Sequence, residues 1–292
     1  MADPILRRHL ASGTFFLAPG AQDMIAATLI REAGFPFVYG SGFWLTASSL
    51  GLPDAGIATY SQMVERMALL VRASGAAVIA DADTGYGGLL NVRHTVQGYE
   101  AAGVTAIQIE DQVFPKKCGH TPNRPCVSTE EMVARIKVAV EARTDPNLVI
   151  IARTDAADSE GFDAARRRLD AYAAAGADML FFEAARSEED LARAVAGAAA
   201  PMMANMATGG VTPILPVATL KEIGFAGAIF PALLSLAAAG AMNAALARLK
   251  ADGIGDGGGA PLADFQTFCR QIGFEDVWAF EARWGGSEPL DC

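Results

Sequence analysis

The chain has 292 residues, is 52% hydrophobic and carries a net charge of −10. This length and composition suit one large domain with a buried core. The acidic balance argues against a nucleic-acid partner, which would require a basic face. No stretch approaches the ~18 uninterrupted apolar residues of a membrane span, and the first ten residues lack the apolar core of a signal peptide. The sequence therefore predicts a cytoplasmic protein with no membrane partner.

The four cysteines form neither a C-x-x-C pair nor a dense disulfide framework. They stand at positions 118, 126, 269 and 292. This pattern predicts reduced thiols in a reducing compartment.

Apolar runs of strand length alternate with Ala-rich segments of helical period along most of the chain, as in repeated βα units on a parallel sheet. The predicted strands cover residues 14–17, 37–39, 77–80, 104–109, 148–152, 179–182, 201–204 and 227–230. The predicted helices between and after them cover residues 22–33, 61–73, about 88–102, 129–143, 162–175 and 233–250. Eight such units favour an α/β fold of the (β/α)8 TIM-barrel type over a doubly wound sheet.

A Gly-rich stretch at 252–259 follows the last unit, and residues 262–284 have a helical pattern. The sequence thus predicts a catalytic barrel over 1–251 and a C-terminal helical extension over 252–292.

Polar and charged residues recur where the predicted strands end. They are Ser41, Asp81, Asp83, Glu110, Arg153, Glu183 and Asn205. In a closed barrel the carboxyl ends of all strands face one mouth, which is where barrel enzymes hold their active sites. We expect these side chains to converge there.

Asp81 and Asp83 stand two residues apart, so both point to the same side of their strand, and Glu110 ends the next strand. Three neighbouring carboxylates repel one another unless a cation is present, and hard oxygen ligands favour Mg2+, with Mn2+ as an alternative. The other interpretation is that one aspartate caps the following helix and Glu110 pairs with Lys116.

Lys116, Lys117 and Cys118 place a thiol beside two ammonium groups. This neighbourhood, together with a bound cation nearby, predicts a lowered thiol pKa and a role in proton transfer or attack. The alternative is a surface loop with an incidental cysteine. Zinc bound by Cys118, His120 and Cys126 is disfavoured, since the spacing fits no common structural zinc pattern.

Arg153 ends an apolar strand and needs an anionic partner, which a substrate carboxylate, Glu183 or Asp155 would each provide. The segment from Ser41 to Phe43 offers backbone N–H groups in a Gly-permitted turn, a candidate cradle for a carboxylate or a phosphonate.

Six segments of the sequence together carry a resemblance to a known family. They are Leu50-Gly51-Leu52-Pro53-Asp54, Asp81-Ala82-Asp83-Thr84-Gly85-Tyr86-Gly87, Ile109-Glu110-Asp111-Gln112, Lys116-Lys117-Cys118-Gly119-His120, Ile151-Ala152-Arg153-Thr154-Asp155 and Ala204-Asn205-Met206. From about residue 17 to 250 the chain resembles the isocitrate lyase and phosphoenolpyruvate mutase superfamily. The Cys-Gly-His ending is typical of its C–C lyases.

The resemblance implies a barrel whose last helix is exchanged between subunits in a homotetramer, a dimer of dimers. It implies Mg2+ held by Asp81 and Asp83, with Asp54 and Glu110 completing the shell largely through water. It implies Cys118 as acid and base on a gating loop with Lys116, Gly119 and His120. The substrate contacts that it implies are Tyr39, Ser41, Gly42, Phe43, Arg153, Glu183 and Asn205.

The implied reaction is cleavage of a 2-hydroxy di- or tricarboxylate to an oxo acid and a second carboxylate. The resemblance is nearest to the 2,3-dimethylmalate lyase, petal-death-protein and methylisocitrate lyase branches. Bulky Phe43 and Trp44 predict a smaller or more apolar substituent on the substrate, whereas Thr208 and Val211, in place of two charged residues, leave the distal end of the substrate open. Oxaloacetate hydrolysis or decarboxylation, a carboxyphosphonoenolpyruvate-type mutase and a non-catalytic metabolite-binding barrel are the alternatives.

Overall fold

The computed structural model describes residues 2–257 and 259–285, so Cys292 and the end of the predicted C-terminal segment lie outside the described residues. The chain divides into two compact units, Met1–Ser235 and Leu236–Cys292, with the division inside one helix. The predicted assignment of 1–251 to catalysis and 252–292 to contacts with a neighbouring subunit remains a prediction.

The first unit is built on eight parallel strands in the order β6-β5-β4-β3-β2-β1-β8-β7. A further parallel bridge between Leu180 and Met202 links the two edges, which makes the sheet a near-closed barrel, as predicted. The strands are β1 (Phe16–Ala21), β2 (Phe37–Gly40), β3 (Ala77–Asp81), β4 (Ala106–Glu110), β5 (Val149–Thr154), β6 (Met179–Phe182), β7 (Met203–Asn205) and β8 (Gly227–Phe230).

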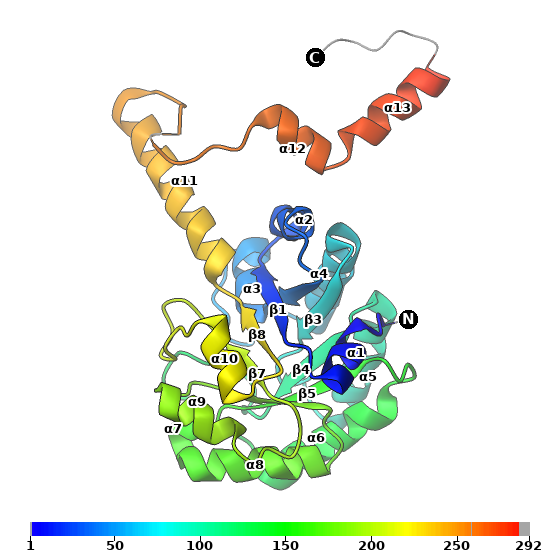
Figure 1. The fold of residues 1–292 in the computed structure, drawn as a ribbon, viewed down its shortest axis with the longest axis vertical. Coiled ribbons are helices and arrows are strands. Elements are labelled where there is room, and N and C mark those ends of the chain that lie inside the picture. The colour runs from blue at the N-terminus through cyan, green and yellow to red at the C-terminus, as the bar shows by residue number, and fades with distance from the viewer. Residues whose placement is uncertain (1, 258, 286–292) are drawn as a thin grey trace. The chain divides into compact units, whose positions relative to one another are not determined.

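Helices surround these strands (Figure 1). They are α1 (Ile5–Ser12), α2 (Met24–Glu32), α3 (Gly42–Leu50), α4 (Tyr60–Ser74), α5 (Leu89–Ala102), α6 (Thr129–Ala142), α7 (Ala157–Glu160), α8 (Phe162–Ala174), α9 (Glu188–Val195) and α10 (Val217–Ile223). Polar side chains cap several of their N-termini: Asp23 caps α2, Thr59 caps α4 and Ser128 caps α6. Such caps satisfy N–H groups that have no partner inside the helix.

Two predicted boundaries differ from the structure for local reasons. Strand β1 continues through Pro19 and Gly20, which normally end strands; a Cβ at Gly20 would lie 2.4 Å from the Pro231 carbonyl oxygen, so only glycine permits this close approach. The predicted loop at 40–43 ends in helix α3, which begins at Gly42 with Ser41 as its N-cap.

Two buried apolar clusters fill the first unit. One lies inside the barrel and includes Phe16, Phe37, Ile79, Ile151 and Phe181. The other lies between the strands and the helices. Because successive strand residues point to opposite faces, each strand contributes to both clusters.

The remaining helices are α11 (Leu233–Asp252), α12 (Phe265–Gln271) and α13 (Phe274–Trp284). Several large apolar side chains of this part are exposed in the single chain, including Leu246, Phe265, Phe280 and Trp284. Exchange of these helices between subunits of a tetramer remains a prediction. Among the described residues, no helix is both long and apolar enough to cross a membrane.

Candidate active site

The period of two along each strand explains how the predicted site residues come together. Asp81 follows Ile79 on the barrel-interior face of β3, and Arg153 follows Ile151 in the same way on β5. Glu183 follows Phe181 and Asn205 follows Met203 by the same spacing. Asp81, Arg153 and Asn205 are therefore the last inward-pointing residues of their strands, and Glu183 continues the same series directly after β6. Together they form the floor of the barrel mouth.

A cavity of about 250 Å³ lies at this mouth. Its lining contains every predicted site residue except Gly42 and Asp83, together with residues that were not assigned a role. The lining residues are Tyr39, Ser41, Phe43, Trp44, Asp54, Asp81, Glu110, Lys116, Lys117, Cys118, Gly119, His120, Arg153, Glu183, Asn205, Ala207, Thr208, Gly209, Gly210, Ile229, Pro231 and Ala232.

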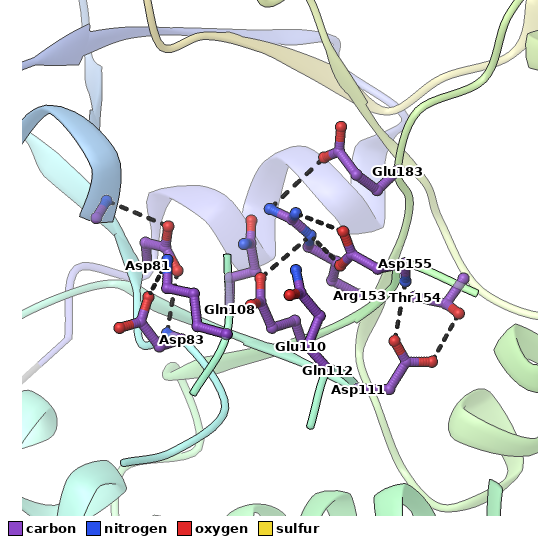
Figure 2. Close-up of polar contacts among 12 residues, drawn as sticks. Asp81, Asp83, Gln108, Glu110, Asp111, Gln112, Arg153, Thr154, Asp155 and Glu183 are labelled. Atoms are coloured by element: carbon purple, nitrogen blue, oxygen red, sulfur yellow. Dashed lines mark hydrogen bonds and ion pairs between the residues drawn. The ribbon is translucent and has the colours of Figure 1, made fainter. Parts of the chain in front are cut away.

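Asp81 is held by two backbone groups (Figure 2). The Gly42 N–H at the start of α3 donates to Asp81 Oδ2 at 3.1 Å, and the Asp83 N–H donates to Asp81 Oδ1 at 3.1 Å. A Cβ at Gly42 would lie 2.9 Å from Asp81 Oδ2. Gly42 thus acts by letting α3 approach the carboxylate closely rather than by offering a free N–H to a substrate.

Lys116 is buried among carboxylates. Its Nζ lies 2.6 Å from Asp54 Oδ1 and 2.6 Å from Asp83 Oδ1. Burial alone would lower the lysine pKa, but the charges of Asp83 and Asp54 raise it well above its ordinary value. Lys116 therefore stays charged. Its ion pairs connect the loop on which it stands to Asp54 and Asp83, two of the predicted metal ligands.

The donor set suits a hard divalent cation. Burial raises the pKa of Asp83 to about 7 and that of Glu110 well above its ordinary range, so both carboxylates gain from added positive charge. Glu110 Oε1 is buried and has no hydrogen-bond partner among the described residues. Within residues 2–257 and 259–285, however, no three His, Cys, Asp or Glu side chains already form a metal-holding cluster. The predicted role of Asp54 and Glu110, holding the cation largely through water, remains a prediction.

Arg153 is surrounded by acidic groups (Figure 2). Two of its three predicted partners, Asp155 and Glu183, contact it at the same time. It donates to both oxygens of Asp155, at 2.8 and 2.9 Å. Its guanidinium also lies 3.4 Å from Glu110 Oε2 and 3.5 Å from Glu183 Oε2. Asp155, one of the three partners predicted for Arg153, is the bidentate partner that orients this arginine.

His120 fastens the segment of residues 116–120, called here the thiol loop, across the mouth. The Val211 N–H donates to His120 Nδ1 at 3.3 Å, which leaves the proton on Nε2, and Nε2 lies 3.2 Å from Glu183 Oε1. Asn205 Nδ2 donates to Glu183 Oε2 at 3.2 Å. The loop is thereby connected to the ends of β6 and β7.

The prediction of a lowered pKa for Cys118 is wrong. Burial raises the pKa of this thiol, and the hydrogen bond from the His120 backbone lowers it by less. The two lysines do not act on the thiol as expected, because Lys116 turns to Asp54 and Asp83 while Lys117 Nζ reaches the Asn123 carbonyl oxygen at 3.5 Å. A neutral thiol that faces the cavity can donate a proton rather than attack as a thiolate.

Asp111, in the same charged stretch, has no direct access to the cavity. Its carboxylate accepts hydrogen bonds from the Thr154 hydroxyl at 2.7 Å, the Asp155 N–H at 2.9 Å and the Tyr172 hydroxyl at 2.8 Å. It therefore joins the end of β4 to the end of β5, beneath Arg153. The period of two separates it from its neighbour: Glu110 continues the inward-facing series that begins at Ala106, whereas Asp111 points to the opposite side with Ile109.

The fold and the cavity define a parallel βα-barrel with polar and charged side chains gathered at the mouth of the barrel, where enzymes of this class hold their active sites. Residues 6–250 match the family described as phosphoenolpyruvate phosphomutase. The chain belongs to the isocitrate lyase and phosphoenolpyruvate mutase superfamily and is a lyase of that superfamily.

Several curated relatives and solved structures are similar over most of their length. The 2,3-dimethylmalate lyase of Eubacterium barkeri is 43% identical over 93% of this chain and 94% of its own length. The 2-methylisocitrate lyase of Halalkalibacterium halodurans is 40% identical over 90% of this chain and 87% of its own. A crystal structure of 2,3-dimethylmalate lyase has a TM-score of 0.91 at 35% identity, covering 100% of both chains.

One solved relative carries ligands relevant to the predicted site. The structure of phosphonopyruvate hydrolase in complex with oxalate and Mg2+ has a TM-score of 0.87 at 32% identity, covering 97% of this chain and 99% of its own. Members of the superfamily thus bind Mg2+ and small carboxylates.

Proposed function

We propose that the protein is a Mg2+-dependent lyase that cleaves a carbon–carbon bond of a malate-type 2-hydroxy dicarboxylate. The substrate class is a 2-alkylmalate, 2,3-dimethylmalate or a related acid such as 2-methylisocitrate, and the products are an oxo acid such as pyruvate and a second carboxylate. The observation that carries this proposal is the neutral thiol of Cys118, held over a cavity whose floor contains Arg153 and several carboxylates.

Asp81 and Asp83, with Asp54 and Glu110, are the residues that would hold Mg2+, or Mn2+ in its place. When bound, the cation would supply positive charge that stabilises the negative charge developing on the substrate oxygens. The raised pKa values of Asp83 and Glu110, both caused first by burial, support a cation at this position.

The N-terminus of α3 would bind one substrate carboxylate. Phe43 and Trp44 occupy the first turn of this helix, where backbone N–H groups have no partner inside the helix, and both residues line the cavity with Ser41. The helix dipole favours an anion there. Tyr39, whose pKa is raised well above its ordinary value by burial and by Asp81, stays protonated and offers a further neutral polar group.

In the bond-breaking step the 2-hydroxyl loses its proton, its oxygen becomes the oxo group, and the C2–C3 bond pair passes to the departing fragment as an enolate. A carboxylate facing the cavity accepts the hydroxyl proton. Arg153, fixed by Asp155, supplies positive charge beside the developing anion.

Cys118 then donates its Sγ proton to the departing carbon, and the proton taken from the hydroxyl restores the thiol. The raised thiol pKa keeps the proton in place until the carbanion forms. Contacts of His120 with Val211 and Glu183 hold the thiol loop over the cavity and keep water from intercepting the carbanion.

The cavity favours a substrate with two carboxylates and an apolar substituent. Its two buried cations are already engaged, since Lys116 pairs with Asp54 and Asp83 and Arg153 pairs with Asp155. A third substrate carboxylate beside them would be buried without a partner, which costs several kcal/mol, so only Lys117 in the cavity lining could receive it. Apolar groups of Trp44, Ile229, Pro231 and Ala232 are available for an alkyl group instead.

The test is a substrate panel with Mg2+ and with a chelator. The panel contains 2,3-dimethylmalate, 2-methylisocitrate, isocitrate, oxaloacetate and phosphonopyruvate, and released oxo acid or glyoxylate is measured. We expect the highest kcat/KM with the alkylmalate and loss of turnover with the chelator. Preferred turnover of oxaloacetate or of the phosphonate would replace this proposal by the hydrolase or mutase alternative.

A further inference from the structure

The thiol loop is joined to β4 by a short antiparallel neck. Gln112 and Cys126 form an antiparallel bridge, the Val113 N–H donates to the Pro125 carbonyl oxygen at 2.8 Å, and the Val127 N–H donates to the Asp111 carbonyl oxygen at 2.8 Å. Arg135 Nη1 donates to the Gln112 carbonyl oxygen at 3.4 Å. The backbone of Gln112 is therefore fixed at the base of the loop.

From this fixed base, the side chain of Gln112 reaches into the loop and forms two hydrogen bonds with one residue. The Lys117 N–H donates to Gln112 Oε1 at 2.9 Å, and Gln112 Nε2 donates to the Lys117 carbonyl oxygen at 2.8 Å. This paired contact fixes which end of the amide is oxygen, because the flipped amide would set donor against donor and acceptor against acceptor.

We infer that Gln112 is a positioning residue for the proton donor Cys118. Gln112 is buried and follows the cavity residue Glu110 by two positions (Figure 2), but it does not itself line the cavity. It acts through the backbone of Lys117. Its side chain forms hydrogen bonds with both the N–H and the carbonyl oxygen of Lys117, as the backbone of a neighbouring strand would. The inference rests on the proposed function, in which Cys118 protonates the departing carbon.

The position of Lys117 explains why this contact matters for both of its neighbours. Lys116 on one side reaches Asp54 and Asp83, and Cys118 on the other side faces the cavity. Fixing the backbone between them fixes the direction of both side chains. The Lys117 side chain contributes little to this, since its Nζ has only a long contact with the Asn123 carbonyl oxygen.

The contact needs a carboxamide of this length. Glutamate has the same size but presents an oxygen where Nε2 stands, and two acceptors would then face each other at the Lys117 carbonyl. Methionine has similar length and neither donor nor acceptor of comparable strength. Gln112→Glu and Gln112→Met therefore remove the paired contact in two independent ways.

The first measurement is the rate at which iodoacetamide alkylates Cys118, followed by mass spectrometry of the Cys118 peptide in the full-length protein. Both variants should react faster than the wild type, by about 10- to 30-fold, the equilibrium factor expected for two ordinary hydrogen bonds. Val113→Thr, a similarly sized change at an exposed position in the neck, is the matched control and should react at the wild-type rate.

The second measurement separates positioning from general structural support. With the alkylmalate and Mg2+, kcat should fall by about 10-fold or more while KM changes by less than about 3-fold, because Gln112 touches neither substrate nor cavity. A thermal unfolding transition shows which variants are folded. If Gln112→Glu does not fold, the test is made with Gln112→Met.

An alkylation rate equal to that of the wild type in a folded variant would overturn the inference. So would a raised KM with unchanged kcat. If the wild type cleaves none of the panel acids, the proposed function fails, while the alkylation rates still decide whether Gln112 holds the loop.

Discussion

His120 Nε2 lies 3.2 Å from Glu183 Oε1, although the two residues are separated by two strands of the barrel in sequence. This contact joins the thiol loop to the end of β6. The Val211 N–H completes it from the other side of the imidazole. His120 is therefore one of the side chains that hold the loop over the cavity, beside Lys116 and Gln112.

Replacing His120 should impair closure without affecting the predicted metal ligands. We expect His120→Ala to lower kcat by about 10- to 100-fold, the range for a misplaced catalytic group, with Mg2+ affinity unchanged. Steady-state kinetics and isothermal titration with Mg2+ give the two values. Wild-type kcat in this variant would show that closure does not need the contact with Glu183.

Gly119 permits the close approach of the loop to the floor of the site. A Cβ there would lie 2.2 Å from Arg153 Nη2 and 2.7 Å from Glu183 Cγ. Gly119→Ala should therefore displace the loop and lower kcat/KM by about 100-fold. Gly88→Ala is the matched control, since a Cβ at Gly88 meets no atom within 4 Å and this variant should keep wild-type kinetics. Equal activity of the two variants would contradict this account.

The pH dependence follows from the direction of the Cys118 shift. Burial raises the thiol pKa, so the proton donor stays loaded through neutral pH and is lost only as the pH rises through that raised pKa. We expect kcat to hold up to at least pH 8 and to fall at more alkaline pH. Alkylation of Cys118 by iodoacetamide should rise over the same range. Rapid alkylation at pH 7 would show a thiolate and contradict a proton-donor role.

Phe43 narrows the cavity beside Trp44, with ring centroids 4.8 Å apart. Phe43→Ala should raise kcat/KM for the larger 2-methylisocitrate relative to 2,3-dimethylmalate, by about 10-fold if one ring's volume is what excludes the larger acid. Competition between the two substrates in one reaction measures the ratio. An unchanged ratio would place the determinant elsewhere in the lining.

The barrel and most of the site were predictable because strand periodicity is local. Asp81, Arg153, Glu183 and Asn205 each stand two residues after a buried inward-facing residue, so their convergence follows from the pattern alone. The pairing of Lys116 with Asp54 was not predictable in this way, because the two are far apart in sequence and meet only through the loop.

The thiol pKa was predicted in the wrong direction for a related reason. Charged neighbours in sequence suggested a thiolate, but the pKa depends on where those side chains turn and on burial, and neither is visible in the sequence. The contact of Gln112 with the Lys117 backbone was likewise hidden, since side-chain to backbone hydrogen bonds leave no spacing signal.

The most direct test of the proposed mechanism is the turnover of Cys118→Ser with the preferred alkylmalate and Mg2+. Serine keeps the size of the side chain but is a much weaker acid, so the account predicts a folded protein whose kcat falls by about 100-fold or more, with KM little changed. Cleavage at a rate near that of the wild type would show that Cys118 does not donate the proton and would contradict the central claim.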